Sequence, residues 1–270
     1  MRLSLNNSPV QEEILEGSKG SVLMIRINRP QVLNSYNLET LTKLYQTIEN
    51  GSQREEIRVL MICGCNGSFS AGAEIDYLSQ RREKADFRTL RKFLEATRNL
   101  ILLLHRVPQF TISSVDGIAA DGGLNLALAC DWRISSDRSL LSYPYLEIGL
   151  CPDIGSSWLL HAIAGLNRAQ NMLITGEQVQ ASDALAFGLV HEIYNPYKDH
   201  QKPFEVALRL AELPPLVIRN IKRSIISNVN PPDKILIQDI ENRMRCIMSE
   251  DFDEGIRAFK ENRKAIFRNF

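Results

Sequence analysis

The sequence has little of what marks an exported, membrane-spanning or nucleic-acid-binding protein. Its 32 Lys and Arg residues are matched by 32 Asp and Glu residues, so the net charge calls for neither nucleic acid nor an anionic membrane. The longest apolar run, Leu100–Leu104, is far too short to cross a bilayer. The first ten residues lack the apolar core of a signal peptide. We therefore expect a cytoplasmic protein that binds neither nucleic acid nor membrane.

Cysteine is also scarce. The chain has five cysteines, an odd number, and of these only Cys63 and Cys65 lie close together in sequence. Their Cys-Gly-Cys spacing is too tight for the usual zinc motif. The pattern is typical of buried free thiols in a reducing compartment, so we expect no metal site.

What the sequence does contain is a regular order of apolar segments. Strands are predicted at 22–27, 59–63, 110–115, 132–135, 140–142 and 189–194, and helices at 38–50, 86–105, 156–164, 168–174 and 182–187. From Phe204 onward the pattern predicts helices alone. The alternation indicates an α/β protein built from ββα units, with a core over residues 1–200 and a helical region over 201–270 used for packing between subunits.

Two glycine-containing loops follow two of the predicted buried strands. The first, GSFSAGAEI, begins at Gly67, and the second, AADGGLN, contains the pair Gly122 and Gly123. Each loop places unpaired backbone N–H groups at the start of a helix, and two convergent N–H donors form an oxyanion hole. In that interpretation Gly122 lets a polar substrate atom approach the backbone, and Gly123 lets helix and strand pack closely. Glycine turns without any binding function are common, so the loops alone leave both interpretations open.

Six ordered segments together resemble the crotonase superfamily, the enoyl-CoA hydratase/isomerase group, over about residues 10–268. They are NRPQVLNSYN, FSAGAEI, VDGIAADGGLNLALACDWRISS, LEIGLCPDIGSSWLL, ITGEQVQASDALAFGLVHEIY and EDFDEGIRAFKENRKAIF. The resemblance implies a crotonase-like spiral of ββα units with a helical C-terminal trimerisation region, and a homotrimer or dimer of trimers. It also implies a role in fatty acid metabolism, with an acyl-CoA substrate and no separate cofactor, since coenzyme A is part of the substrate. An enolate-like intermediate would be held by the backbone N–H groups of Ala73 and Gly122.

The chain departs from this family at two positions. Hydratases of the family carry a glutamate two residues after the last glycine of the second loop, where this chain has Asn125. They carry another directly after the proline of the following strand-loop, where Pro144 is followed by Tyr145. An amide is not a practical acid or base, and an unperturbed tyrosine has a pKa of about 10. A hydration mechanism that uses two carboxylates is therefore in doubt.

Asp153 is the acid that the resemblance places near the reacting carbons. Several isomerase-type members carry their single working carboxylate at this position, and a double-bond shift needs only one group that removes a proton and returns it two carbons away. The alternative role for Asp153 is to cap the helix that begins in IGSSWLL.

Four further residues are candidates for contact with the substrate. By the resemblance these are Tyr145, Asn125, Glu147, in a strand-loop predicted over 146–150, and Lys260, which would reach the CoA phosphates, often from a neighbouring subunit. A surface charge at Glu147 and a solvated basic face at Lys260 are the plainer alternatives. Asp121 stands where relatives often have glycine, and we expect its side chain to point to solvent.

The sequence thus predicts an enoyl-CoA isomerase with Asp153 as the acid or base and with Ala73 and Gly122 as oxyanion donors. Hydration, decarboxylation and thioester hydrolysis by the same scaffold stay open as alternatives, as does a catalytically inactive acyl-CoA-binding protein. The acyl group is not defined, because the pocket walls come from the poorly matched region 75–85.

Overall fold

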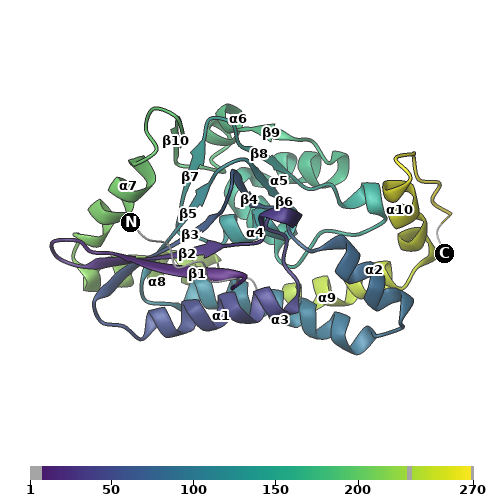
Figure 1. Cartoon of the computed structure of the whole chain (residues 1–270), viewed down its shortest axis with the longest axis horizontal. Coiled ribbons are helices and arrows are strands. Elements are labelled where there is room, and N and C mark those ends of the chain that lie inside the picture. The colour runs from purple at the N-terminus through teal and green to yellow at the C-terminus, as the bar shows by residue number, and fades with distance from the viewer. Residues whose placement is uncertain (1–7, 230–232, 269–270) are drawn as a thin grey trace.

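The computed structural model describes residues 8–229 and 233–268 and is built around a six-stranded sheet (Figure 1). The strand order is β1-β2-β3-β5-β7-β10, in which β1 runs antiparallel to β2 and the other neighbours are parallel. The strands are β1 (Val10–Leu15), β2 (Ser21–Ile27), β3 (Ile57–Gly64), β5 (Phe110–Val115), β7 (Trp132–Ser136) and β10 (Glu192–Tyr194).

The central strands are apolar because both faces of the sheet are covered. In β2 and β3 the segments VLMI pair in register, with Leu23 opposite Leu60 and Met24 opposite Met61. Leu23 and Leu60 belong to the large apolar core that includes residues of α1 (Leu38–Ser52) and α3 (Phe87–Arg106). Met61, on the opposite face, belongs to a smaller core that includes residues of α7 (Lys202–Ala211). Continuous apolar runs are what a doubly covered parallel sheet requires.

A second, four-stranded sheet repeats the order of the first. Its strands, in the order β4-β6-β8-β9, are β4 (Ser68–Ser70), β6 (Ile118–Ala120), β8 (Leu140–Ser142) and β9 (Val179–Gln180). Along the chain, β3 leads into β4, β5 into β6 and β7 into β8, and helices follow each pair. The α/β architecture of repeated ββα units is therefore confirmed.

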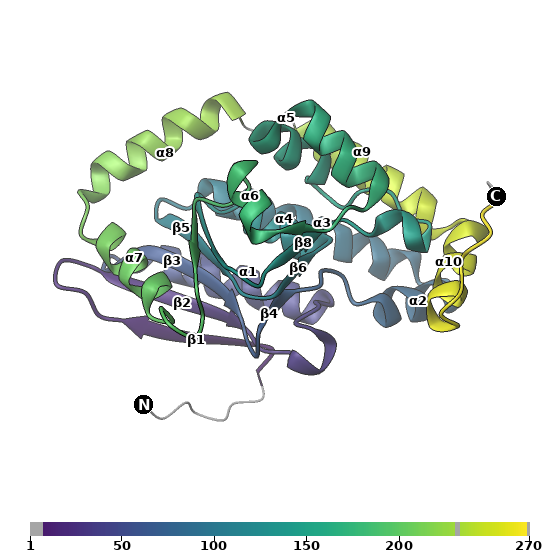
Figure 2. The ribbon, with the colours of Figure 1, turned by 90° about the horizontal axis from the view of Figure 1, so that it is seen from above.

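The remaining helices surround the two sheets. They are α2 (Ile75–Glu83), α4 (Gly122–Leu128), α5 (Ser156–Thr175), α6 (Ala181–Ala186), α8 (Pro215–Val229), α9 (Asp233–Ile247) and α10 (Glu250–Lys260). Residues 195–229 and 233–268 contain helices but no strand, as the sequence predicts. Seen from above, α8 reaches from α7 towards α5 and α9 (Figure 2). No helix in the described part of the chain is long and apolar enough to cross a membrane.

Most predicted elements are present, but the short ones differ. The two helices predicted on either side of Gly165 form one element, α5, whose backbone is interrupted at that glycine (φ 78°, ψ 167°). The strand-loop predicted over 146–150 is wrong, because the chain forms the 3₁₀ helix η2 (Tyr145–Ile148) there. The patterns of β1, β4, β6, β9 and α2 are too short or too weakly amphipathic to stand out in the sequence.

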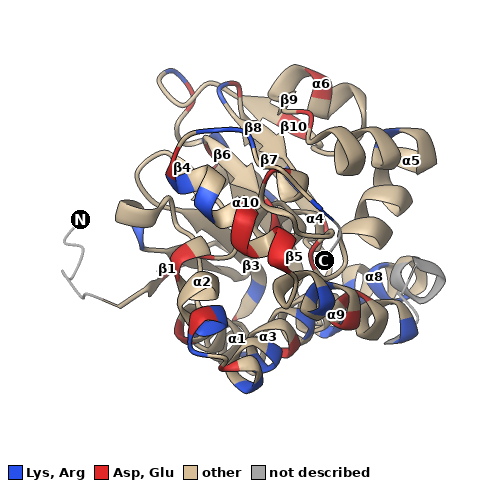
Figure 3. Ribbon diagram, turned by 90° about the vertical axis from the view of Figure 1, so that its right-hand side faces the viewer, with Lys and Arg blue, Asp and Glu red and all other residues tan. Residues whose placement is uncertain are grey.

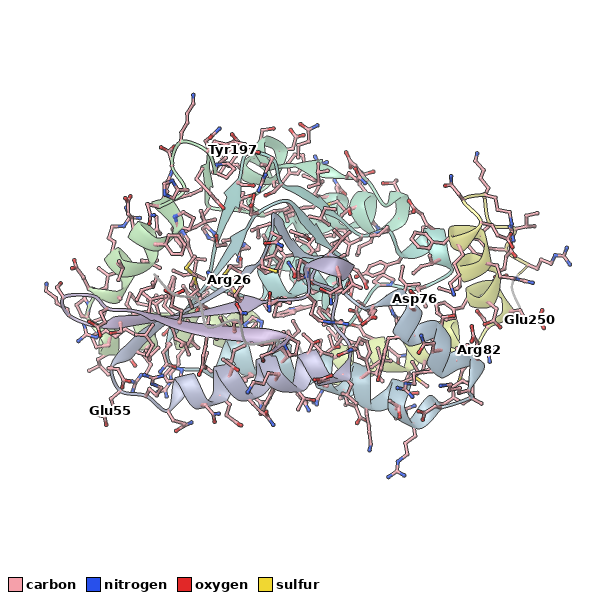
Figure 4. The ribbon with its side chains drawn as sticks, viewed as in Figure 1. Arg26, Glu55, Asp76, Arg82, Tyr197 and Glu250 are labelled. Carbon is pink, nitrogen blue, oxygen red and sulfur yellow. The ribbon has the colours of Figure 1, made fainter. Side chains whose placement is uncertain are left out.

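The last helix, α10, is capped at its start by a side chain. The Ser249 hydroxyl accepts a hydrogen bond from the Phe252 N–H at 3.2 Å. Acidic residues stand in its first turn, where the ribbon is red in Figure 3. Asp76 and Arg82 of α2 lie on the side of the molecule that α10 occupies (Figure 4), and Arg82 pairs with Asp253 at 2.9 Å. The helix is thus fixed to the body of the protein by charge as well as by apolar packing.

Helix α8 exposes much of its surface but is attached to the sheet by one buried cation. The Lys222 ammonium group lies 2.7 Å from an Asp131 carboxylate oxygen and donates to the Leu104 and Gln109 carbonyl oxygens at 3.0 and 2.9 Å. All three donor positions of the ammonium group are therefore engaged.

Lys222→Met should lower the free energy of unfolding by about 3–5 kcal/mol, because it leaves the Asp131 carboxylate buried without its cation. The measurement is chemical denaturation followed by circular dichroism. Arg223→Met, at the exposed neighbouring position, is the control and should change the free energy by less than about 0.5 kcal/mol. Equal effects of the two substitutions would contradict the assignment of Lys222 as the anchor.

Candidate functional site

The two glycine loops lie against each other near the middle of the molecule, where α4, β4 and β6 meet (Figure 1). Gly72 has φ +85°, and a Cβ atom added to it would lie 2.7 Å from the Asp121 Cβ and 2.8 Å from the Gly122 nitrogen. A Cβ atom on Gly123 would lie 2.3 Å from the Ser70 carbonyl oxygen. Side chains at these glycines would push the loops apart, so close approach of the backbone is the reason for glycine here.

Gly122 opens onto two polar side chains. A Cβ atom added to it would lie 1.7 Å from the Tyr36 hydroxyl oxygen and 2.4 Å from Asp153 Oδ2. Tyr36 is positioned by backbone hydrogen bonds with the first loop, since its N–H donates to the Gly72 carbonyl and its carbonyl accepts from the Glu74 N–H. The two loops therefore bring Tyr36 and Asp153 to the start of α4.

Asp121 does not point to solvent, so that expectation is wrong. Its side chain is buried, and one carboxylate oxygen accepts a hydrogen bond from the Ala73 N–H at 3.4 Å. Both oxygens also lie 3.4 Å from a terminal nitrogen of Arg243. The backbone of Asp121 has a positive φ (φ +53°, ψ −133°), which is a strained conformation for a residue with a side chain.

Asp153 is 1% exposed, and neither of its carboxylate oxygens has a hydrogen-bond partner among the described residues. The pKa of Asp153 is raised to about 7, chiefly by burial and also by the Asp121 carboxylate, and this value includes the lowering effects of the Arg243 guanidinium and the Ile154 backbone N–H. A carboxyl group with a pKa near neutrality can both accept and return a proton.

The capping role considered for Asp153 does not occur in this structure. The N-cap of α5 is Gly155, and no side chain caps it. The carbonyl oxygen of Asp153, rather than its carboxylate, accepts the hydrogen bonds from the Ser156 N–H and hydroxyl, at 3.0 and 2.5 Å.

Asn125 and Tyr145 hold the segment that carries Asp153. The Asn125 amide group donates to the Ile154 carbonyl at 3.3 Å and the Ser156 hydroxyl at 3.0 Å, and its oxygen accepts from the Tyr143 hydroxyl at 2.7 Å. The Tyr145 hydroxyl lies 2.7 Å from the Ser156 hydroxyl. Both residues are buried, and in this structure their polar groups are used within the protein. Contact of either with a substrate stays a prediction.

The structure places Glu147 and Lys260 away from this buried group. The Glu147 side chain is exposed on η2, as in the surface-charge alternative, and its contact with a substrate stays a prediction. Lys260 is half-exposed on α10 and pairs with Asp76 of α2 at 3.6 Å. Glu74, at the start of α2, pairs with Arg29 at 2.7 Å.

The sequence analysis missed two residues of the site, Tyr36 and Arg243. Arg243 comes from α9 and is 1% exposed. Its guanidinium group donates to the Cys151 carbonyl at 2.5 Å and lies 5.0 Å from the centre of the Tyr145 ring. The signal was present, because Arg243 falls at helical spacing on the same face as the buried residues Leu236 and Ile240. A lone cation on an apolar helix face needs a buried anion.

Two carboxylates and one guanidinium thus share one buried site. Burial lowers the pKa of Arg243, but Asp121 and Asp153 outweigh this and raise it above its ordinary value. Burial, with Asp153 and Asp121, raises the pKa of Tyr36 well above its ordinary range, so its hydroxyl remains a proton donor at neutral pH. The described residues contain no group of three or more His, Cys, Asp or Glu that could hold a metal ion.

Comparison with known proteins agrees with this geometry. The model of the enoyl-CoA hydratase/isomerase family matches residues 17–269. The chain belongs to the enoyl-CoA hydratase/isomerase family. Its fold is accordingly the crotonase fold, which its structural neighbours share.

The relatives in this family include proteins named as isomerases and proteins named as hydratases. A trans-2-decenoyl-[acyl-carrier-protein] isomerase from Streptococcus mutans is 26% identical over 268 residues, with 95% of this chain and 98% of that protein covered. A short-chain-enoyl-CoA hydratase from Clostridium acetobutylicum is 27% identical, with 97% of each covered. The crystal structure of an enoyl-CoA hydratase from Mycobacterium avium subsp. paratuberculosis superposes with a TM-score of 0.87 at 28% identity, covering 97% of this chain and 99% of that one.

Asp153→Asn should make the protein more stable above neutral pH. The folded-state pKa of about 7 lies above the ordinary value of 3.8, so the carboxyl costs no stability below pH 3.8 and an increasing amount as the pH rises to about 7. The variant lacks this cost and should gain on the order of 1–4 kcal/mol at pH 8 but nothing at pH 3.5.

Denaturation with urea at a series of pH values tests this prediction. Glu147→Gln, which changes an exposed carboxylate, is the control and should leave the pH dependence unaltered. A gain for Asp153→Asn that is the same at every pH would contradict it.

Proposed function

We propose that this enzyme is an isomerase that moves a carbon–carbon double bond in an enoyl thioester, with Asp153 as the acid and base. The observation that carries the proposal is the Asp153 carboxylate, which is buried, lacks hydrogen-bond partners and lies beside Gly122 at the contact between the two glycine loops. Its pKa of about 7 suits both halves of a proton shuttle at neutral pH.

In the proposed reaction, ionised Asp153 removes a proton from the carbon between the thioester and the double bond. The electron pair of the broken C–H bond moves towards the thioester oxygen and gives a dienolate. The Ala73 and Gly122 N–H groups stabilise that oxygen by hydrogen bonding. Protonated Asp153 then returns the proton two carbons away, so the product differs from the substrate only in the position of its double bond.

The residues at two positions support isomerisation over hydration. Asn125 and Tyr145 stand where the resemblance places the two working glutamates of hydratases, and burial raises the pKa of Tyr145 well above its ordinary range, which makes it a poor base. The isomerase from Streptococcus mutans, which aligns along nearly the whole chain, bears on the substrate. Its name specifies an acyl-carrier-protein thioester, so both CoA and carrier-protein thioesters are candidate substrates.

Hydration is the second candidate because of Asp121. With Asp153 it brings two carboxylates into one site, even though neither occupies the glutamate positions of the hydratases. The hydratase from Clostridium acetobutylicum aligns along this chain as fully as the isomerase does.

Incubation with 3-enoyl, 2-enoyl and malonyl-type thioesters of CoA and of acyl carrier protein, followed by mass spectrometry and chromatography, separates the candidates. Isomerisation changes retention but not mass, whereas hydration adds water and decarboxylation removes carbon dioxide. Hydrolysis releases the free acid, and a binding protein changes nothing. We expect a shift in retention at constant mass.

Asp153→Asn should lower kcat by about 10²- to 10⁴-fold with acyl thioester binding retained, because it removes the proposed base. In the wild type, kcat/KM should rise with pH up to about 7 and then level off, since the free enzyme needs Asp153 ionised. Steady-state kinetics from pH 5 to 9 measure both. Glu147→Gln serves as the exposed control, and full activity of Asp153→Asn would exclude Asp153 as the base.

We also propose that the chain forms a trimer or a dimer of trimers. Within the predicted helical region 201–270, Phe252 and Ile256 of α10 are buried inside this chain, so they offer no surface for a subunit contact. The better support is α8, which leaves four large apolar side chains exposed at Leu216, Val217, Ile221 and Ile225.

Light scattering at micromolar concentration should therefore give three or six times the chain mass. Ile221→Glu together with Ile225→Glu should shift the protein towards the monomer, because charges replace apolar side chains on the exposed face of α8. The matched control is Leu166→Glu, an exposed apolar position on α5. A monomeric wild type would refute the proposal.

A further inference from the structure

The Asp121 carboxylate lies in front of the Ala73 N–H, in the position that a thioester oxygen would have to take to be held by that N–H. The Ala73 N–H donates to Asp121 Oδ2 at 3.4 Å, a long and weak hydrogen bond. A backbone N–H has one hydrogen atom, so it forms a strong hydrogen bond with only one acceptor at a time. If Ala73 is an oxyanion donor, as the proposed function requires, the carboxylate must leave it when the substrate binds.

The backbone of Asp121 is fixed, so the movement has to come from its side chain. The Asp121 N–H donates to the Ser142 carbonyl at 3.2 Å, and the Asp121 carbonyl accepts from the N–H groups of Leu124 and Asn125 in the first turn of α4. The residue that faces the Asp121 Cβ is Gly72, which has no side chain to restrict rotation of the Asp121 side chain.

Arg243 is placed to receive the displaced carboxylate. Its terminal nitrogen already lies 3.4 Å from both oxygens of Asp121, longer than a well-formed charge-assisted hydrogen bond of about 2.7–2.9 Å. The guanidinium group is held by the Cys151 carbonyl at 2.5 Å and by the Tyr145 ring. A small rotation of Asp121 away from Ala73 would shorten the contacts to a cation that is already in place.

The balance of charge in the site also requires the Asp121 carboxylate to move away from the Ala73 N–H. An enolate that forms at the Ala73 amide adds negative charge beside Asp121, and a carboxylate at such short range would oppose it strongly in a buried site. Asp121 and Asp153 both face the Arg243 guanidinium, with Tyr36, Tyr143 and Tyr145 as their uncharged neighbours. Arg243 can offset the Asp121 charge throughout the reaction.

We propose that Arg243 is a positioning residue that draws the Asp121 carboxylate off the Ala73 amide when a thioester oxygen binds there, and that balances the charge of Asp121 while the enolate exists. This inference rests on the proposed function, because it assumes that Ala73 is an oxyanion donor. It assigns Asp121 no part in proton transfer.

A double-mutant cycle on residues 121 and 243 tests the proposal. Arg243→Gln should lower kcat/KM by about 10²-fold, the effect of losing one oxyanion donor. Asp121→Asn should raise kcat/KM above that of the wild type, because asparagine has nearly the same shape as aspartate and carries no charge to oppose the enolate. The double variant should recover at least tenfold relative to Arg243→Gln. Arg243→Lys, which keeps the cation, should lie between the wild type and Arg243→Gln.

Two readouts separate this role from mere packing. Loss of the Arg243 cation should move the rise of kcat/KM to higher pH, and Asp121→Asn should move it to lower pH, since these groups shift the pKa of Asp153 in opposite directions. Arg245→Gln, at an exposed position on the same helix, should change neither rate nor profile. Melting temperatures identify any variant that fails to fold. The double variant removes both charged partners together, so it leaves no unpaired charge at residue 121 or 243.

Binding of butyryl-CoA, measured by calorimetry, keeps the test independent of turnover. The affinity for butyryl-CoA should follow the same order as kcat/KM. It should be lowest for Arg243→Gln and should recover in the double variant. If the wild type turns over no thioester but this order holds, the isomerase function fails and the role of Arg243 stands. The inference is overturned if the folded double variant is as impaired as Arg243→Gln. It is also overturned if Asp121→Asn loses activity 10²-fold, which would make Asp121 an acid or base.

Discussion

The contact between the two glycine loops is the constraint on which the rest of the site depends. Neither Gly72 nor Gly122 has room for a Cβ atom, because at Gly72 it would meet Asp121 and the Gly122 nitrogen, and at Gly122 it would meet Tyr36 and Asp153. The contact between the loops is possible because β4 and β6 pair in parallel and carry the loops side by side. Everything polar in the site is then placed relative to this contact: Tyr36 and Asp153 at Gly122, and Asp121 between Gly72 and Arg243. A side chain at either glycine would disturb all four.

This arrangement lowers the stability of the fold, because it buries charged groups. Charged groups taken out of water are expensive unless they are paired, and Asp153 has no hydrogen-bond partner for either oxygen. A chain selected only for stability would place an apolar or amide side chain there. Retention of an unpaired carboxyl in an otherwise well-satisfied network of Asn125, Ser156 and Tyr145 is typical of a functional site, where some stability is given up for reactivity.

Much of the fold could be predicted from the sequence, because long apolar segments have clear periods. The strand Phe110–Val115 and the helix around Phe93 and Leu94 follow directly from such patterns. Asp153 could be singled out by resemblance alone. Arg243 and the orientation of Asp121 could not, because both depend on how α9 packs against the second loop across more than 100 residues of chain. Whether Glu147 is exposed could not be decided from the sequence, because η2 has no regular apolar period.

The Lys222 anchor has a consequence for the order in which the chain folds. Its partners, Leu104, Gln109 and Asp131, lie up to 118 residues earlier in the sequence and come together only when β5 and the start of β7 have paired. Helix α8 therefore has no binding site for its cation until the parallel sheet exists, and contacts between such distant parts of a chain form slowly. During synthesis on the ribosome, the sheet can assemble while α8 is still unmade. During refolding from denaturant, α8 is present from the start and must wait for the sheet, so its apolar face is exposed to other chains for longer.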